Sequence, residues 1–400
     1  MTASSLSTVG AVLKGIVAGK SVQTLDRSPV GNELAILKVS AVTWGEFRPN
    51  ECKAMPAGYE PGDCPRAMDG DILISRANTR ELVGAPVMVQ GNHPNLLLSD
   101  KLLKLIPDER LVKREYLVRA LRFPAAAQHF AQCAGGTSGS MTNITQENIR
   151  QTPIRLPGLP EQRRIAAILD QADALRARRR QALAELDKLA QAVFLEMFGN
   201  PVANAKGWPA QRLTEVCHTY SGGTPSKSNA SLWEGTVPWF SAKDMKAYDL
   251  FDSQDHISET VPQNTSLKLL PPNTVAIVVR GMILAHTFPV CVLRVAATIN
   301  QDLKALIPKV PLDAQFLANC LRAQAGSVLE RVSEAGHGTK RLDAEGLHQI
   351  SIILPPPNEQ ADFATRVKAI ECLQATHRAA LAESDTLFAS LQDRAFTGTL

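Results

Sequence analysis

The most regular hydrophobic pattern in the chain lies between Leu159 and Phe198. Apolar residues there recur in alternating steps of three and four, which is the spacing of a heptad seam on one long α-helix. The members of this predicted seam are Ile165, Ile168, Ala172, Leu175, Arg179, Ala182, Leu186, Leu189 and Val193. Pro160 suits the first turn of a helix, and Gly199 with Asn200-Pro201 predicts its end. At about 1.5 Å per residue, this helix forms a rod of roughly 55 Å.

A second heptad pattern begins near Asn358, a suitable N-cap residue, with Asp362 in the first turn. The members of this less regular seam are Phe363, Val367, Ile370, Leu373, His377, Leu381, Ser384, Leu387 and Leu391. Arg179 and His377 take equivalent seam positions, where a polar residue usually fixes the register of paired helices. Since neither helix alone hides its apolar stripe, we predict that the two pack against each other in antiparallel orientation.

The two helical segments are copies of one another at a shift of 198 residues. Leu156-Pro157 followed by Glu161-Gln162 recurs as Leu354-Pro355 followed by Glu359-Gln360. Solenoid repeats have periods of about 20–50 residues, so a shift this long indicates the duplication of a whole domain.

Each helix follows a mixed segment in which short apolar runs, typical of buried strands, are separated by turn residues. In the first segment the predicted strands are 34–39, 71–74 and 102–106, and the predicted helix is 112–133, interrupted at Pro124. In the second they are 275–279, 290–295 and 303–307, with a helix over 313–332. Arg76 and Arg280 follow corresponding strands, but the segments otherwise differ widely.

These patterns predict an α+β chain with a pseudo-two-fold internal repeat: two similar mixed α/β domains separated by a pair of long antiparallel coiled-coil helices. The predicted boundaries are 1–155 for the first domain, 156–200 for the central spacer helix, 201–353 for the second domain and 354–400 for the C-terminal spacer helix. A similar scaffold with a different surface is what two readers of two different targets require.

Composition narrows the class of protein. The chain has 400 residues and 44% hydrophobic content, enough for two or three domains, and a net charge of only +4, so a polyanion must be met by local patches. The seven cysteines form no Cys-x-x-Cys pair and do not cluster with histidines, which argues against a zinc site and for a reduced, cytoplasmic chain. The N-terminus lacks the features of a signal peptide, and no apolar run is long enough to span a membrane.

Enzymatic motifs are not evident in the sequence. The run 222–228 resembles a phosphate loop, but Ser226 stands where glycine is required before Lys227, and Pro225 removes an amide. We find neither G-x-G-x-x-G opening a helix nor H-E-x-x-H, and the acidic residues and histidines are scattered. We therefore predict no catalytic residues, no metal site and no cofactor in this chain.

Polar, glycine-rich loops with hydroxyl and cationic side chains occur in both halves, at 135–142, 221–228 and 336–341. Glycine lets backbone amides approach a phosphate, while Ser, Thr, Lys and Arg donate to phosphates and base edges. Other cations follow aromatic residues, as Arg48 follows Trp44. The predicted DNA-binding residues are Arg48, Arg76, Arg80, Thr137, Ser138, Ser140, Thr142, Ser221, Thr224, Ser226, Lys227, Lys243, Lys246, Arg280, Thr339, Lys340 and Arg341.

The segment Leu156–Ala166, closing on Phe194–Pro201, resembles the central segment of type I restriction-modification specificity subunits. Leu354–Gln360 and Ala395–Leu400 are similar to the closing segment of that family. Stretches that look like openings of the two target recognition domains lie at 39–45, 70–73, 207–209, 221–226 and 237–239. The likeness covers nearly the whole chain.

The resemblance implies a DNA reader without catalytic activity, whose two target recognition domains each bind half of a bipartite, asymmetric duplex target. The helix pair acts as a ruler, and two modification subunits dock around it and methylate adenine with S-adenosylmethionine. Restriction subunits that use ATP and Mg²⁺ join them. The residues expected in the helix seam or at partner subunits are Glu161, Gln162, Ile165, Leu175, Arg179, Leu186, Glu359, Gln360, Ile370, Leu373, His377 and Leu387.

Two alternatives remain open at this point. The chain could be a coiled-coil adaptor whose domains bind proteins and not DNA, or an enzyme with a non-standard site. A steep loss of DNA affinity with salt distinguishes a DNA reader from an adaptor, and binding of S-adenosylmethionine or ATP by the isolated chain would favour the enzyme.

Overall fold

The computed structural model describes residues 5–138, 141–334 and 338–400, and gives only the backbone of Ser5, Thr137 and Ser138. The chain divides into two compact units. Unit 1 is Met1–Arg178 with Ala380–Leu400, and unit 2 is Arg179–Ala379. Each unit therefore consists of one mixed domain and about half of each long helix. The predicted domain boundaries, which assign the helices to separate segments, remain a prediction.

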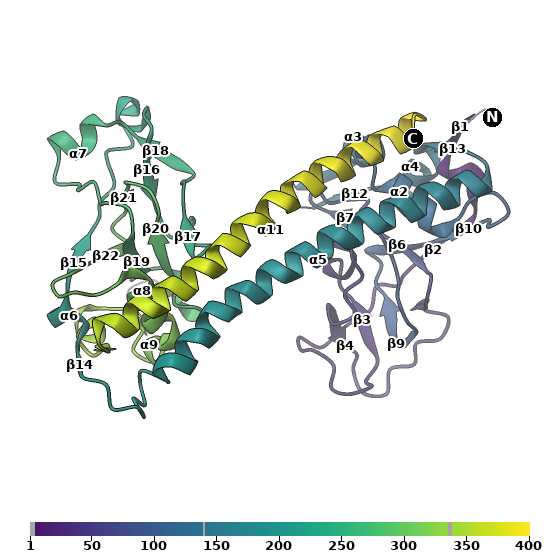
Figure 1. The fold of residues 1–400 in the computed structure, drawn as a ribbon. Coiled ribbons are helices and arrows are strands. Elements are labelled where there is room, and N and C mark those ends of the chain that lie inside the picture. Colours follow the sequence, from purple (N-terminus) through teal and green to yellow (C-terminus); the bar gives the residue numbers. More distant parts are fainter. Residues whose placement is uncertain (1–4, 139–140, 335–337) are drawn as a thin grey trace. The chain divides into compact units, whose positions relative to one another are not determined.

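The two long helices, α5 (Leu159–Phe198) and α11 (Pro357–Thr397), have the extents that the heptad patterns predict (Figure 1). In unit 1 the Arg164 guanidinium donates to the Leu400 carbonyl (2.8 Å), and Arg176 Nε donates to the Asp385 carboxylate (2.5 Å). Partner numbers fall as α5 numbers rise, so the pairing is antiparallel. Unit 2 contains the matching contact, in which the Gln374 amide donates to Asp187 (2.8 Å).

The seam between the helices differs from the predicted one at four leucines. Leu175 and Leu189 of α5 are each 44% exposed, and Leu373 and Leu387 of α11 are 52% and 54% exposed. The neighbouring residue lies inward in each case: Arg176, Ala190, Gln374 and Phe388. The side chains of Ile165, Arg179, Leu186, Ile370 and His377 are buried or half-buried, and their assignment to the seam stays a prediction.

Arg176 shows why the hydrophobic pattern gave the wrong residue. Its guanidinium is bonded to Asp385 and Asp173 and lies 4.3 Å from the ring centre of Phe388. A half-buried arginine is stable when its charge is paired and its stem packs on apolar atoms. A pattern that scores leucine as inward and arginine as outward therefore displaces the seam by one residue.

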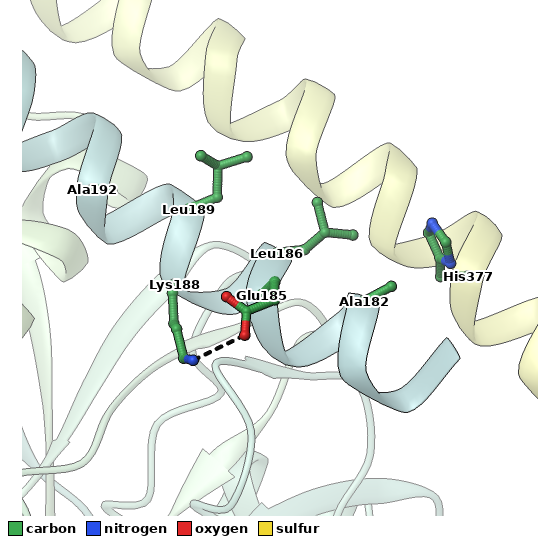
Figure 2. Close-up of a pocket in the computed structure, with 7 residues that line it drawn as sticks. All are labelled: Ala182, Glu185, Leu186, Lys188, Leu189, Ala192 and His377. Atoms are coloured by element: carbon green, nitrogen blue, oxygen red, sulfur yellow. Dashed lines mark hydrogen bonds and ion pairs between the residues drawn. The ribbon is translucent and has the colours of Figure 1, made fainter. Parts of the chain in front are cut away.

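The polar seam position in unit 2 is partly open. Figure 2 shows His377 of α11 facing Ala182 of α5, beside a groove that Leu186 and Leu189 also line. Lys188 forms an ion pair with Glu185 (3.1 Å) along α5. Within the described residues, the buried His377 Nδ1 has no hydrogen-bond partner, as expected for a position that contributes register and little stability.

The domain of unit 1 is built on a four-stranded antiparallel sheet in the order β2-β10-β6-β8, with a second sheet in the order β4-β3-β9-β5, where β3 and β9 are parallel. The smaller sheets are β1-β13 and β11-β12-β7. Its strands are β1 Ser5–Thr8, β2 Leu13–Ala18, β3 Ala35–Leu37, β4 Cys52–Ala54, β5 Arg66–Ala67, β6 Ile72–Ser75, β7 Ala77–Asn78, β8 Pro86–Met88, β9 His93–Leu98, β10 Leu102–Pro107, β11 Gly135–Ser138, β12 Met141–Asn143 and β13 Pro153–Leu156. Its short helices are η1 Val9–Val12, α1 Ser40–Thr43, α2 Arg114–Leu121, α3 Pro124–Cys133 and α4 Gln146–Gln151.

The domain of unit 2 repeats this plan with the antiparallel order β15-β22-β19-β20, to which β17 adds in parallel, and with a second sheet β18-β16-β21, where β16 and β21 are parallel. The smaller sheets are β14-β25 and β23-β24. Its strands are β14 Ala210–Arg212, β15 Cys217–Ser221, β16 Val237–Phe240, β17 Asp249–Leu250, β18 Asp255–Ile257, β19 Thr274–Val278, β20 Val290–Leu293, β21 Thr298–Ile299, β22 Leu303–Pro308, β23 Ser333–Glu334, β24 Lys340–Arg341 and β25 Ser351–Ile353. Its short helices are α6 Leu213–Val216, η2 Ala230–Trp233, α7 Thr260–Asn264, η3 Met282–Ala285, α8 Ala314–Ala323, α9 Ala325–Leu329 and α10 Ala344–His348.

Two predicted elements need correction. The helix expected over 313–332 is two helices, because the backbone leaves helical geometry at Gln324, whose buried amide donates to the Cys320 and Ser351 carbonyls. The N-terminal segment, where no strand was predicted, contains β1 and β2, which pair with β13 and β10. Its residues alternate only weakly, and the pairing of β1 depends on a strand more than 140 residues away, which local pattern does not encode.

In each unit an arginine of the domain forms an ion pair with a long helix. The carboxylate that accepts it lies at the same position of the repeat in both helices. In unit 1, Arg119 of α2 bonds to Asp170 (2.7 Å) and Asp173 (2.8 Å) of α5. In unit 2, Arg294, which follows β20, bonds to Glu371 of α11. Asp173 and Glu371 are related by the shift of 198 residues, so both copies of the repeat present a carboxylate to their own domain.

Candidate nucleic-acid interface

A glycine loop follows β15 in unit 2 and lies directly against the chain after β21. A Cβ on Gly222 would lie 1.8 Å from the Ile299 carbonyl oxygen, so only glycine allows this approach. The Gly223 amide donates to the same carbonyl (3.0 Å), and the Trp239 indole donates to the Gly223 carbonyl (2.8 Å). The loop predicted from its glycines is thus held by two hydrogen bonds, one from the Gly223 amide and one to the Gly223 carbonyl.

The hydroxyls of this loop contact polar residues that the sequence did not single out. Lys304 Nζ of β22 donates to Ser221 Oγ (2.8 Å), and the two are cross-strand partners. Thr224 Oγ1 donates to Gln301 Oε1 (2.6 Å). Because each bond joins a loop hydroxyl to the adjoining strand or turn, both pairs hold their polar groups in place at one edge of the sheet.

Three cations line one surface cavity of about 360 Å³ at this edge: Arg280, Lys304 and Arg341. Arg280 and Arg341 are neighbours across a β-bridge. Burial and the charge of Arg341 lower the pKa of Lys304. In the part of the chain that the structure describes, none of the three forms an ion pair within 4.0 Å. Asp343 also lines the cavity, but its carboxylate accepts the Gly346 amide as the N-cap of α10.

The other predicted DNA-binding residues of unit 2 are less available. Lys243 is paired with Asp255 (2.9 Å), and Lys340 with Glu334 (3.0 Å). The Ser226 hydroxyl is bonded to that of Ser228 (2.7 Å). The two remaining lysines, Lys227 and Lys246, are exposed and Thr339 is half-buried.

The predicted residues of unit 1 that the structure describes have varied surroundings. Arg76 and Arg80 are exposed, and Arg48 pairs with Glu46 (2.7 Å) beside the Trp44 ring. Thr142 is a correction: its side chain is 4% exposed and its hydroxyl donates to the Asn78 carbonyl (3.1 Å), so it serves the sheet and not a ligand. The side chains of Thr137 and Ser138 and all of Ser140 lie outside the described residues.

The glutamines of the repeated Glu-Gln motif, predicted for the seam or a partner surface, are buried and bond to backbone groups outside the opposite long helix. The Gln162 amide accepts from the Lys113 amide (2.8 Å) and donates to the Leu111 (3.0 Å) and Pro157 (2.8 Å) carbonyls. Gln360 repeats this, accepting from the Asp313 amide (3.1 Å) and donating to the Pro355 carbonyl (3.0 Å). Each ties the start of a long helix to the N-cap of the domain helix α2 or α8. Glu161 and Glu359 are half-buried.

Reactive groups are not prominent. Burial raises the pKa of the thiols of Cys217, Cys291 and Cys320 to about 11, 12 and 12, so these thiols are protonated at neutral pH. Within residues 5–138, 141–334 and 338–400 no group of three or more His, Cys, Asp or Glu side chains is arranged to hold a metal ion. No helix in these ranges combines the length and apolar character needed to cross a membrane.

The sequence matches a known family over most of its length. The model of the type I restriction modification DNA specificity domain matches residues 64–187 and 205–383. The chain belongs to this family. The two matched ranges fall on the two copies of the repeat, in agreement with a duplicated specificity domain.

Individual relatives agree with this assignment. The specificity subunit of the type I restriction enzyme EcoR124I/EcoR124II from Escherichia coli is 33% identical over 228 residues, which cover 55% of this chain and 54% of that protein. The chain spans about half the length of this curated relative.

Solved structures of the same class share the fold. The type I restriction-modification system S subunit from M. genitalium has a TM-score of 0.56 at 14% identity, covering 98% of this chain and 96% of that one. A chain from work on complex assembly and conformational transition of the type I R-M system also has a TM-score of 0.56, at 22% identity, covering 100% and 99%. The predicted α+β fold with two similar domains and paired long helices is confirmed.

Proposed function

We propose that this chain is the sequence-specific DNA-binding specificity subunit of a type I restriction-modification complex, and that it is not itself catalytic. The observation that carries the proposal is that units 1 and 2 share the order of four antiparallel strands in their main sheets but carry different side chains at equivalent positions. Two copies of one scaffold with unlike surfaces suit a bipartite, asymmetric target in which each domain reads one half. Membership of the specificity-domain family supports this.

The long helices supply the spacing in this proposal. α5 and α11 have 40 and 41 residues, so each is a rod of roughly 60 Å. Their antiparallel contacts within each unit give one register, with Arg176 against Asp385 and Asp187 against Gln374. Half-sites separated by about one turn of duplex, roughly 34–36 Å, lie within the reach of such a ruler.

The exposed leucines of the helices support docking of two copies of one partner, which we identify with the modification subunits. Leu175 and Leu387 belong to unit 1 and flank the Arg176–Asp385 contact; Leu189 and Leu373 belong to unit 2 and flank the Asp187–Gln374 contact. The shift of 198 residues relates Leu175 to Leu373 and Leu189 to Leu387. Each unit thus exposes an equivalent leucine pair, and exposed apolar side chains mark interaction sites more often when they recur together.

The chemistry of the complex then belongs to the partners: S-adenosylmethionine on the modification subunits, and ATP with Mg²⁺ on the restriction subunits. Co-purification with the modification subunit tests the docking part. Leu175→Glu with Leu189→Glu should lower the number of bound modification subunits, whereas Leu269→Glu, at a 49% exposed leucine outside the long helices, should not. Two subunits retained by the double variant would exclude the leucine pairs as docking sites.

The ruler is tested by removing one heptad from each helix, residues 180–186 and 375–381, which correspond when the register of the contacts within each unit is continued along the helices. The rods shorten by roughly 10 Å, or about three base pairs of duplex. Mapping of methylated adenines should show both half-sites unchanged and the gap between them shorter. A matched variant that duplicates the same segments should lengthen the gap, and an unchanged gap in both variants would refute the ruler.

A further inference from the structure

In unit 2 one surface cavity is lined by three cationic side chains, Arg280, Lys304 and Arg341. Three cations near one another repel, and Lys304 is half-buried, so its charge is only partly solvated. No carboxylate of the described residues neutralises them within 4.0 Å. An arrangement of this kind is favourable once an anion enters.

We propose that this cavity binds one phosphate group, and that in the complex this phosphate is a phosphodiester of the half-site that unit 2 reads. The proposal rests on the DNA-binding function proposed above and adds to it the ligand class and the residues. Lys304 and the two guanidiniums donate to the anion, and Ser221 fixes the ammonium of Lys304 through its 2.8 Å bond. Charge-assisted bonds from such a fork suit phosphate oxygens.

Strand register shows which described residues of unit 1 take the positions of the three cations. In unit 2 Leu303 pairs with Val278, and in unit 1 Leu102 pairs with Ser75. The next residue along each strand is Lys304 in unit 2 and Leu103 in unit 1, so these two positions correspond. In unit 2 Arg280 pairs with Arg341 across a β-bridge, and in unit 1 Ala77 pairs with Asn143 at the corresponding place. The three cations of unit 2 are therefore replaced in unit 1 by the neutral residues Ala77, Leu103 and Asn143.

The same register corrects the sequence comparison. Arg76, taken as the counterpart of Arg280, lies at the position of Val279, because its carbonyl accepts the Ile144 amide as that of Val279 accepts the Leu342 amide. Successive side chains of a strand point to opposite faces of the sheet. The Arg76 side chain therefore points to the face opposite the one that corresponds to Arg280. Among the described residues, the three cations of unit 2 thus have no cationic counterparts at the equivalent positions of unit 1.

Salt-dependent titration of the full chain with a random-sequence duplex tests the site. Each phosphate contact contributes about 0.9 to the slope of log affinity against log salt. Lys304→Met should lower that slope by about one and weaken binding roughly tenfold at fixed salt, uniformly across sequences. Arg341→Met, a change at an exposed side chain, should act alike. Lys304→Arg should restore the slope.

The matched control is Lys53→Met, which also removes one positive charge but at a lysine of unit 1 that is already paired with Asp26 (2.8 Å). It should leave the slope unchanged. If Lys304→Met and Arg341→Met behave like this control, the site is refuted. Loss of discrimination at a single base pair without a change of slope would also overturn the proposal, because it would indicate base readout in place of a phosphate contact.

Calorimetric titration with inorganic phosphate separates the anion site from the proposed function. The wild-type chain should bind phosphate weakly, and Lys304→Met and Arg341→Met should abolish the heat of binding. If phosphate binds in this manner but no duplex does, the site stands and the DNA-binding function fails. If duplex binds and the variants change neither slope nor phosphate binding, the function stands and the site fails.

Discussion

Arg176 in unit 1 and Gln374 in unit 2 occupy the same position of the repeat, and each reaches across the helix pair to an equivalent aspartate, Asp385 or Asp187. In unit 1 the contact is an ion pair over an aromatic ring. In unit 2 it is a neutral amide donating to a carboxylate, and Gln374 is 6% exposed. The register is therefore set by the position of the contact, while its chemistry differs between copies.

The contrast extends to the packing at the ends of the helices. Phe198 of unit 2 is fully buried against Phe194, Phe316 and Phe363. Its counterpart in unit 1, Phe396, is half-buried against Tyr116 and Phe123. One domain is thus joined to its helices by a dry aromatic cluster and the other by fewer rings and more ion pairs, which makes the two junctions separable by experiment.

The largest difference is expected from the aromatic pair. Phe198→Ala should destabilise unit 2 by about 3–5 kcal/mol, since it removes a buried ring and leaves a cavity. Phe396→Ala should cost unit 1 clearly less, because part of that ring is already solvated. Amide hydrogen exchange of α8 and of α2 reports the two units separately. Equal losses would show that the junctions are not as different as the burial indicates.

A smaller effect is expected from the buried glutamines. Gln162→Ala leaves the Lys113 amide and two carbonyls without their partner, whereas Gln360→Ala leaves one amide and one carbonyl. Unpaired buried groups cost about 1–3 kcal/mol, so both variants should be destabilised, Gln162→Ala the more. Exchange of the first-turn amides of α2 and α8 checks this. Substitution of the exposed Gln151 should have no effect.

Exchanging the seam residues should have a modest effect. Arg176→Gln loses two ion pairs, with Asp173 and Asp385, and a cation–π contact, and should destabilise unit 1 by about 1 kcal/mol. Gln374→Arg places a cation opposite Asp187 and should leave unit 2 within about 1 kcal/mol of its original stability. Denaturant titration of each variant gives these values. A large loss in Gln374→Arg would show that the unit 2 seam accepts only a neutral residue.

The smallest expected effect is the pH dependence that Glu371 contributes to the stability of unit 2. Burial raises the pKa of Glu371 above its ordinary value of 4.5, against the opposing effect of Arg294. The folded unit then holds a proton more tightly than the unfolded chain, so its stability falls as pH rises from about 4.5 through the raised pKa. Glu371→Gln should flatten this fall. Hydrogen exchange of α8 across that range measures it, and an unchanged profile would assign the dependence to another group.

How far the sequence predicts the site depends on the kind of residue. The loop at Ser221–Thr224 was recognised from its glycines and hydroxyls, and Arg280 and Arg341 from their charge. Lys304 was not recognised, because it lies within an apolar strand. The local pattern there predicts only a lysine whose side chain is exposed to solvent. The role of Lys304 becomes evident only in the tertiary structure, where β15 places Ser221 beside it. A search for cations in strands that flank a glycine loop would have found it.

The sequence alone determined the duplication, the length of both helices and the main apolar strands of each domain, because period, caps and apolar runs are local signals. Only the tertiary structure decided which face of each helix is buried. α5 and α11 pack on one another and on a domain at once, so paired polar residues such as Arg176 and Gln374 lie inward while Leu175 and Leu373 stay exposed. Burial is decided by all the surfaces that meet at a residue, and a one-dimensional pattern records only one of them.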